Sequence, residues 1–239
     1  MKRNFFLVLS ALLLTAPVFS QDDNRPASVL SIQDDIAGLA LGTSYNHAFD
    51  NRYEGVEGTP FMNKDWENGG IYLLSGKFYN NLKLKLDAYN NNLIFQTNDG
   101  KDILLDKSLL DYFILTNNDG TELRKFKVVR TPENPLGHYY QVLYDKDISL
   151  LLKYEKVYVK ADYQKAINTN RRYDEFKTNK IWYIYKPGDQ EPQKIKLNKR
   201  EAKELFSGRS DVSNFISKNN LNMKSPEDWV ELLTFISSN

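Results

Sequence analysis

The feature that most constrains the fold is an alternation of apolar and polar side chains, which runs with interruptions from Ile71 to about Leu197. It is complete in Leu82–Ala88, where leucine or alanine fills every second position and lysine or aspartate fills the positions between. Successive side chains of a strand point to opposite faces, so this pattern gives one apolar face and one wet face. Antiparallel sheets have such faces, and we predict an antiparallel sheet here.

Turn residues divide this region into about ten short strands. Two Asn-Asp-Gly sequences, starting at Asn98 and Asn118, favour tight hairpins because their residues tolerate positive φ. The predicted strands are Leu82–Ala88, Leu93–Thr97, Ile103–Leu105, Tyr112–Leu115, Leu123–Val129, Tyr139–Tyr144, Ser149–Ala161 (one bent strand or two), Ile181–Tyr185 and Lys194–Leu197. Strands this short and regular are typical of a sandwich or a partly open barrel.

The alternation is preceded by a segment dense in turn residues, Gly58–Gly70, which carries two large rings, Phe61 and Trp66. Such a segment has little apolar surface of its own. We therefore expect it to become ordered only by docking those rings onto another part of the protein.

After Leu197 the apolar period changes to that of a helix, and three short helices are predicted. Asn198 is an N-cap candidate for the first, and Ser210 or Asp211 opens the second. Ser225 starts the third, with proline and two acids behind it. Its apolar face repeats at i, i+3, i+4 and i+7, at Trp229, Leu232, Leu233 and Ile236. The predicted fold class is therefore α+β, mainly β, with a helical unit packed on the sheet.

The first twenty residues have the pattern of a secretory signal peptide. Lys2 and Arg3 precede an apolar run of about ten residues, and Ser20 is a small residue suited to cleavage before Gln21. A retained membrane anchor is the alternative, but the run is shorter than the roughly 20 residues that span a bilayer. We expect an exported protein, periplasmic or secreted, without stable membrane insertion after cleavage.

We expect four segments along the chain: residues 1–20 as the signal peptide, 21–57 as a flexible or loosely docked lead, 58–197 as the β domain and 198–239 as the helical unit. The chain has no cysteine, which excludes disulfides, thiolate metal sites and lipidation at a cysteine. Loss of Lys2 and Arg3 changes the net charge from +1 to −1. A nearly neutral chain has no field to gather nucleic acid, so no nucleic-acid partner is expected.

The segment Gly58-Thr59-Pro60-Phe61-Met62-Asn63, followed by Gly70-Ile71-Tyr72, resembles a family of uncharacterised exported proteins of Gram-negative bacteria. Members of that family read roughly G-x-P-[FY]-x-N … G-x-Y near the start of the mature domain. The resemblance covers residues 58–239. It implies export and this architecture, and it supplies no activity and no site residue.

Motifs for catalysis or cofactor binding are scarce. The chain has two histidines, His47 and His138, and neither lies near a Gly-x-Ser-x-Gly or an H-E-x-x-H sequence. No phosphate-binding or dinucleotide-binding glycine pattern is present, so we predict no cofactor and no metal site. Asn98–Asp102 places oxygen ligands at alternate positions, as calcium loops do, but it lacks their order and is better explained as a hairpin turn.

One polar segment, Asp162–Asn179, interrupts two good strands and is long for a loop in a compact domain. Within it, Arg171, Arg172 and Tyr173 are candidate contacts for a protein or glycan partner. The alternative is a solvated hairpin tip.

The function that these features favour is a non-enzymatic binding or envelope-interaction module for an unidentified protein or glycan. Two alternatives stay open. Export and the aromatic content of 13% also suit a glycan hydrolase with two carboxylates. An adaptor that docks on an outer-membrane partner would expose Leu232, Leu233 or Ile236 in an apolar patch.

Overall fold

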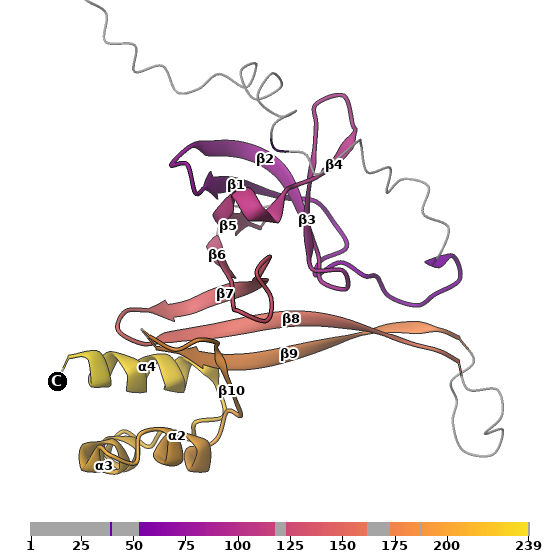
Figure 1. Ribbon diagram of the computed structural model, residues 1–239. Helices are drawn as coiled ribbons and strands as arrows, with labels where there is room; N and C mark the ends of the chain where they lie inside the picture. Colours follow the sequence, from indigo (N-terminus) through magenta and orange to yellow (C-terminus); the bar gives the residue numbers. More distant parts are fainter. Residues whose placement is uncertain (1–38, 40–52, 118–122, 162–172, 187, 239) are drawn as a thin grey trace, which may run out of the picture.

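A computed structural model describes residues 39, 53–117, 123–161, 173–186 and 188–238. It contains ten strands in a single antiparallel sheet, followed by three helices (Figure 1). The strands are β1 (Glu67–Leu73), β2 (Phe78–Asp87), β3 (Asn92–Gln96), β4 (Asp102–Leu104), β5 (Leu110–Thr116), β6 (Leu123–Val129), β7 (His138–Asp145), β8 (Ser149–Val159), β9 (Glu175–Tyr185) and β10 (Gln193–Ile195). The helices are α2 (Lys199–Leu205), α3 (Ser210–Lys218) and α4 (Pro226–Ser237), and a short 3-10 turn, η4 (Lys107–Leu109), precedes β5. The predicted fold class is confirmed.

The strand order across the sheet is β10-β9-β8-β7-β6-β5-β1-β2-β3-β4. Each neighbouring pair follows the chain except at one place, where β5 pairs with β1 instead of β4. The sheet is not closed, because β4 and β10 remain its two edges. One continuous sheet forms, so the two separate sheets of a sandwich do not.

The first eight strands curl around the larger apolar core. Its members come from β1, β2, β3, β5, β6 and β7, and the Tyr154 ring of β8 packs against it. The curl brings β8 back to the end of β2, where the amide of Lys156 donates to the carbonyl of Ala88 at 3.2 Å. This half of the molecule is therefore a partly open barrel, the other architecture expected from the strand spacing.

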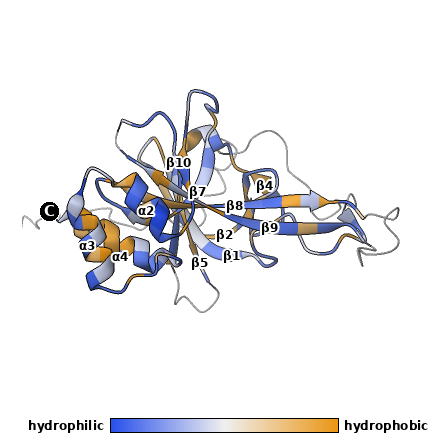
Figure 2. Cartoon of the chain, turned by 90° about the horizontal axis from the view of Figure 1, so that it is seen from below, coloured by the Kyte–Doolittle hydropathy of each residue, from blue (hydrophilic) through white to orange (hydrophobic). Residues whose placement is uncertain are grey.

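The three helices pack together and onto one end of the sheet. Trp229, Leu232 and Leu233 are fully buried in a second apolar cluster that also contains Leu150 of β8 and Ile184 of β9. Figure 2 shows apolar stretches on α3 and α4. The two predicted capping side chains are confirmed: Asn198 accepts from the amide of Glu201 at 2.9 Å, and Ser225 accepts from that of Asp228 at 3.3 Å.

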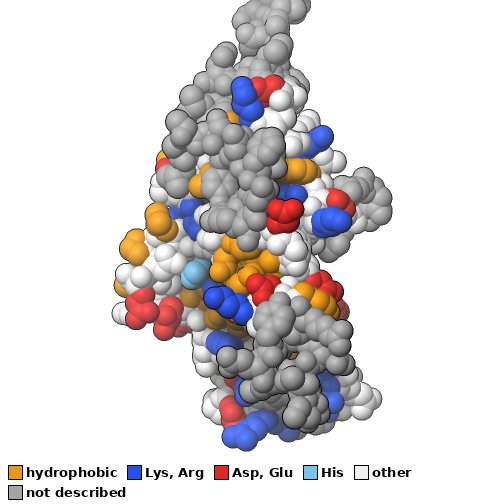
Figure 3. Space-filling view, turned by 90° about the vertical axis from the view of Figure 1, so that its right-hand side faces the viewer, with side chains coloured by type: hydrophobic (Ala, Val, Ile, Leu, Met, Phe, Trp, Pro, Cys, Tyr) orange, Lys and Arg blue, Asp and Glu red, His pale blue; other side chains and the backbone are white. Residues whose placement is uncertain are grey.

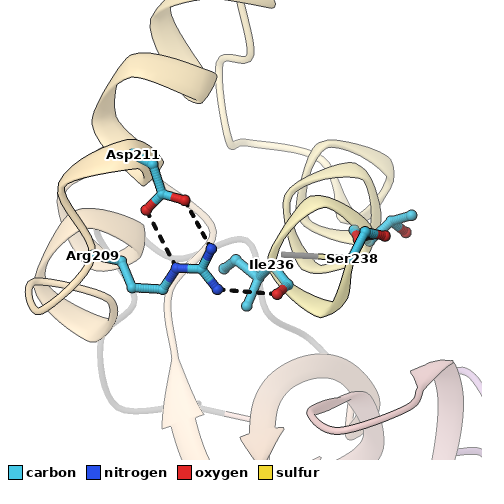
Figure 4. Close-up of polar contacts among 5 residues, drawn as sticks. Arg209, Asp211, Ile236 and Ser238 are labelled. Atoms are coloured by element: carbon cyan, nitrogen blue, oxygen red, sulfur yellow. Dashed lines mark hydrogen bonds and ion pairs between the residues drawn. The ribbon is translucent and has the colours of Figure 1, made fainter.

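An arginine joins the start of α3 to the end of α4 (Figure 4). Arg209 donates to both carboxylate oxygens of Asp211, at 2.8 and 3.3 Å, and to the carbonyl of Ile236 at 3.0 Å. The carbonyl groups at a helix C-terminus carry a partial negative charge, so a guanidinium is well placed there. The contact fixes how the two helices meet.

Beyond its pairing with β7, which ends at Leu152, the β8–β9 ladder continues as a two-stranded arm, residues 153–159 and 175–181 (Figure 1). Four rings, Tyr53, Tyr89, Tyr158 and Phe176, meet at its end with centroids 4.9 to 6.3 Å apart. These contacts tie the arm to the segment before β1 and to the turn after β2.

Two features differ from the prediction. Gly58–Gly70 is not turn throughout, because β1 already begins at Glu67. The predicted loop Asp162–Asn179 is too long, because β9 starts at Glu175. In both cases pairing with neighbouring strands extends a strand whose own residues do not alternate clearly. Ser149–Ala161, expected as one bent strand or two, forms the single strand β8, which ends at Val159.

Candidate functional site

A β-bulge opposite a glycine hollows the outer face of the barrel. Gly69 of β1 pairs with Leu82 and Ile71 pairs with Tyr79, so two residues of β2, Asn80 and Asn81, face the single residue Gly70. Asn81 has a φ of 56°, a left-handed conformation that asparagine tolerates. Bulges of this kind redirect side chains and are common beside binding sites.

A ladder of aromatic side chains stands next to the bulge. The Tyr72 ring of β1 stacks between the rings of Phe78 and Tyr112, and both centroid distances are 4.0 Å. The ammonium group of Lys125 lies 4.2 Å from the centroid of Tyr112 and ends the ladder. Partial desolvation, and then a hydrogen bond with the Tyr72 hydroxyl, raise the pKa of Tyr112.

The bulge and the ladder together bound a cavity of about 290 Å³, the outer-face pocket. Its lining residues are Asn68, Gly69, Gly70, Tyr72, Phe78, Asn80, Asn81, Ile114, Thr116 and Leu123. Three of the polar side chains are amides, which both donate and accept hydrogen bonds, and two carry hydroxyls, Tyr72 and Thr116. Phe78 and Leu123 supply exposed apolar surface, with 40% and 66% of their area open to solvent.

The side chains that line the outer-face pocket include no carboxylate, imidazole or amine. General acid–base chemistry needs a group that exchanges a proton near neutral pH, and nucleophilic catalysis needs an activated nucleophile. The lining offers neutral hydrogen bonds and apolar contact instead. These can hold an uncharged amphiphilic ligand.

Of the residues singled out in the sequence, Arg171, Arg172, Ser20, Gln21 and His47 lie outside the described part of the chain. Tyr173 lies within it and is 46% exposed. Its hydroxyl is hydrogen-bonded to the Glu57 carboxylate, which raises the pKa of the phenol. Tyr173 lies close to the end of the arm, two residues before β9 begins. It is not among the residues that line the outer-face pocket.

His138 is half-buried at the start of β7. Its pKa is lowered, first by burial and then by the charges of Lys153 and Lys107, while Glu155 opposes this shift. Among the described residues, no hydrogen bond joins the imidazole to a serine hydroxyl or a carboxylate, and its Nδ1 atom is buried without a partner. On this side of the molecule, hydrophobic side chains gather beside a histidine and basic groups (Figure 3).

A group of cations that the sequence did not suggest, Lys107, Arg130 and Lys153, lies beside the η4 turn. The Lys107 ammonium donates to the carbonyl of Asn91 and lies 4.7 Å from the ring centroid of Tyr139. Burial, with Lys153 and Arg130 nearby, lowers its pKa to about 8. Arg130 donates to the carbonyls of Lys107 and Ser108 in the η4 turn and to that of Leu110 at the start of β5, at 2.7 to 3.3 Å. These hydrogen bonds satisfy backbone carbonyls, so the role of the group is structural.

Two carboxylates share a polar depression of about 310 Å³, lined by Asn63, Lys64, Asp65, Glu67 and Asn117. Glu67 is buried, and its two oxygens are taken by Arg124 and by the amide of Asn63, the latter at 2.7 Å. The lining has no aromatic ring. A hydrolase of the expected kind would place two carboxylates across an aromatic-lined cleft, and this depression lacks those walls.

The segment before β1 and the Asn98–Asp102 hairpin were both singled out in the sequence. Phe61 and Trp66 do dock, because the Lys85 ammonium of β2 lies between them, 4.5 and 5.0 Å from the ring centroids. In the Asn98–Asp102 hairpin, Asp99 is paired with Lys101 at 2.7 Å. Hydrogen bonds from Lys101 and Thr97 lower the Asp99 pKa to about 2.

The helical unit offers no apolar patch at the positions that an adaptor would need. Leu232 and Leu233 are fully buried, and Ile236 is 9% exposed. They pack within the cluster that joins the helices to the sheet. The adaptor hypothesis therefore lacks the surface on which it depended.

No protein-family model, no curated protein and no solved structure matches the chain. Within the described ranges, no helix is long and apolar enough to cross a membrane. In that same part of the chain, no group of three or more histidine, aspartate or glutamate side chains is placed to hold a metal ion.

Proposed function

We propose that this protein is an exported, non-enzymatic module that binds a neutral saccharide in the outer-face pocket. The observation that carries the proposal is the lining of that pocket, where three amides and two hydroxyls lie beside an apolar wall with no charged group. Export is supported by the charged and apolar pattern of residues 1–20 and the small residue before Gln21.

A neutral saccharide has the chemistry that this lining complements. Sugar rings carry hydroxyls that donate and accept hydrogen bonds, and asparagine amides at positions 68, 80 and 81 can do both in return. The C–H faces of the ring are apolar and pack on aromatic or aliphatic side chains such as Phe78 and Leu123. The cavity, at about 290 Å³, has room for one or two sugar units.

Binding is favoured over hydrolysis because the pocket has no carboxylate. A glycosidase needs two, and the pair that lies together, Asp65 and Glu67, lies in another depression. There, Glu67 is held in an ion pair with Arg124, where 9% of the Glu67 side chain is exposed.

The test is an NMR titration of the ¹⁵N-labelled protein with neutral oligosaccharides of glucose, mannose, xylose and N-acetylglucosamine, two to six units long. The proposal predicts that at least one of them shifts the side-chain amide signals of Asn80 and Asn81. Phe78→Ala should weaken this binding at least tenfold, because it removes the apolar wall. Leu136→Ala, a change of a side chain that is 60% exposed on another loop, is the matched control and should have no effect.

Two results would reject the proposal. One is a titration in which no oligosaccharide shifts the pocket amides. The other is turnover of a bound oligosaccharide that Glu67→Gln abolishes, since the chain would then be a hydrolase. Export has its own readout: the N-terminus of protein recovered from the periplasm of a Gram-negative host should be Gln21 by mass spectrometry.

A further inference from the structure

The outer edge of β9 is occupied at both ends and open in between. At one end the amide of Phe176 donates to the carbonyl of Glu57 at 2.8 Å. At the other end β10 pairs with residues 182–184 of β9, from Trp182 to Ile184. Within the described residues, no backbone group pairs with the outward edge at Thr178 and Lys180.

The direction of these amides follows from the ladder. The register between β8 and β9 is continuous from Ser149 to Val159, without a bulge. Because the Phe176 amide points away from β8, every second amide after it does too. The N–H and C=O groups of Thr178 and Lys180 therefore face outward. The open stretch that contains them, residues 177–181, is roughly 13 Å long at 3.3 Å per residue.

A basic groove lies along this open edge. Its volume is about 560 Å³, and it is lined by Glu155, Thr178, Asn179, Lys180, Ile181, Trp182, Lys194, Ile195, Lys196 and Leu197. Three lysines face one carboxylate, and the lysines are exposed. Ile181 and Trp182 add half-buried apolar surface between the charges.

We propose that this edge binds an extended, acidic segment of a partner protein by strand addition between Glu57 and β10. Main-chain hydrogen bonds to Thr178 and Lys180 would hold the backbone, as in other cases of β-augmentation. Carboxylates of the segment would pair with Lys194 and Lys196, while apolar side chains on its two faces would pack on Ile181 and on Trp182 respectively. This site and the outer-face pocket share no lining residue, so the proposal stands independently of saccharide binding.

Other occupants fit the edge less well. A non-peptide polyanion would satisfy the lysines but would leave the amides of Thr178 and Lys180 without a complementary ladder. A second copy of the chain would bring lysine against lysine, which is repulsive. Lysines also protect an open edge from unwanted pairing, a role that requires no partner. An edge whose lysines only prevent pairing would bind no acidic peptide, so peptide binding distinguishes the two roles.

The experiment selects binders from a displayed library of random decapeptides, using the purified protein expressed from the full sequence. We expect the selected peptides to be acidic and rich in β-branched residues. On binding, the amides of Thr178 and Lys180 should become protected from hydrogen exchange. The double change Lys194→Gln with Lys196→Gln should weaken binding at least tenfold and reduce its salt dependence.

Thr178→Pro is the decisive variant. The substitution removes an N–H that points outward, so the β8–β9 ladder keeps its hydrogen bonds. Proline is also tolerated on a strand edge. We expect it to fold and to weaken peptide binding at least tenfold. Thr178→Ala, which keeps the N–H, is the matched control and should bind within twofold of the original protein.

Several outcomes would overturn the proposal. One is selection of no acidic peptide. Another is binding that Thr178→Pro leaves intact while the lysine changes abolish it, with inorganic polyphosphate competing, which would assign the groove to polyanions. A dimer in light scattering that Thr178→Pro dissociates would assign the edge to a second copy. If Thr178→Pro fails to fold, exchange protection at Thr178 and Lys180 in the unmodified protein decides the question.

Discussion

The Phe78 ring lies directly over Gly70 of the neighbouring strand. A Cβ atom on Gly70 would stand 2.8 Å from Cε2 of Phe78 and 3.0 Å from the carbonyl oxygen of Tyr79. An aromatic ring over a strand glycine covers backbone that the missing side chain leaves bare. The ring of Phe78 is also a wall of the outer-face pocket, so the absence of a side chain at Gly70 makes room for the ring that shapes the site.

Gly70→Ala should therefore destabilise the protein by about 1–3 kcal/mol, the usual cost of overpacking, and should reduce saccharide binding by moving Phe78. The two effects can be separated with the double variant Gly70→Ala with Phe78→Ala, which removes the closest clash. Chemical denaturation of the single and double variants gives the coupling energy. A coupling near zero would mean that the ring and the glycine do not depend on each other.

Two buried tyrosines should respond in opposite ways to loss of the hydroxyl. The Tyr144 hydroxyl donates to the carbonyl of Leu233 at 3.2 Å, whereas the Tyr139 hydroxyl is buried with no hydrogen-bond partner among the described residues. Tyr144→Phe is expected to cost about 1 kcal/mol, and Tyr139→Phe is expected to be neutral or stabilising. Denaturation midpoints of the two variants, which remove the same atom, provide the comparison.

Removing the Tyr139 hydroxyl should not lower the free energy of unfolding. Burial is the main cause that raises the pKa of the Tyr139 phenol far above 10; the charge of Arg130 opposes this shift and that of Asp106 adds to it. A loss of 1 kcal/mol or more in Tyr139→Phe would show that the hydroxyl has a partner in solution, and the assignment of an unsatisfied group would be wrong.

Lys107 should make stability depend on pH in the alkaline range. Its folded-state pKa of about 8 lies below the ordinary value of 10.5, so between these values the unfolded chain holds more protons than the folded one. Stability then rises with pH across that window, and the cost of burying the charge is fully present below pH 8. Lys107→Met should lose this rise.

The measurement is urea denaturation of both proteins at pH 7, 8, 9 and 9.5. The difference in the free energy of unfolding between the two proteins removes the contribution of the tyrosines. That contribution opposes the trend only above the unperturbed tyrosine pKa near 10. Lys153, Arg130 and His138 lie near Lys107 and are common to both proteins. A constant difference across this range would contradict a lowered pKa for Lys107.

Local signals in the sequence were enough for the elements that depend on neighbours in the chain. The caps at Asn198 and Ser225 and the hairpin at Asn98 were all predictable, because each rests on contacts within five residues. β1 was not fully predictable. Its Asn68-Gly69-Gly70 sequence resembles a turn, and only pairing with β2 and β5 on both sides makes it a strand.

The outer-face pocket was not predictable for the same reason. Its lining residues come from β1, β2, β5 and β6. They are spread between positions 68 and 123, and no regular spacing in the sequence links them. The bulge that creates it exists only in the register of two strands. The sequence pointed instead to Arg171 and Arg172, in a long polar segment, whereas the lining of this pocket is neutral.

The C-terminal helices depend on Trp229 more than on any capping residue. Its ring is fully buried in the cluster between helices and sheet, and its Nε1 atom donates to the carbonyl of Met223 at 3.1 Å. Trp229→Ala should cost about 3–5 kcal/mol, since it leaves a large cavity. Trp229→Phe should cost less, because it keeps most of the apolar contact and loses the hydrogen bond and part of the ring volume. Urea unfolding of both variants tests this order, and an equal loss would show that the hydrogen bond to Met223, rather than the packing, holds the helices.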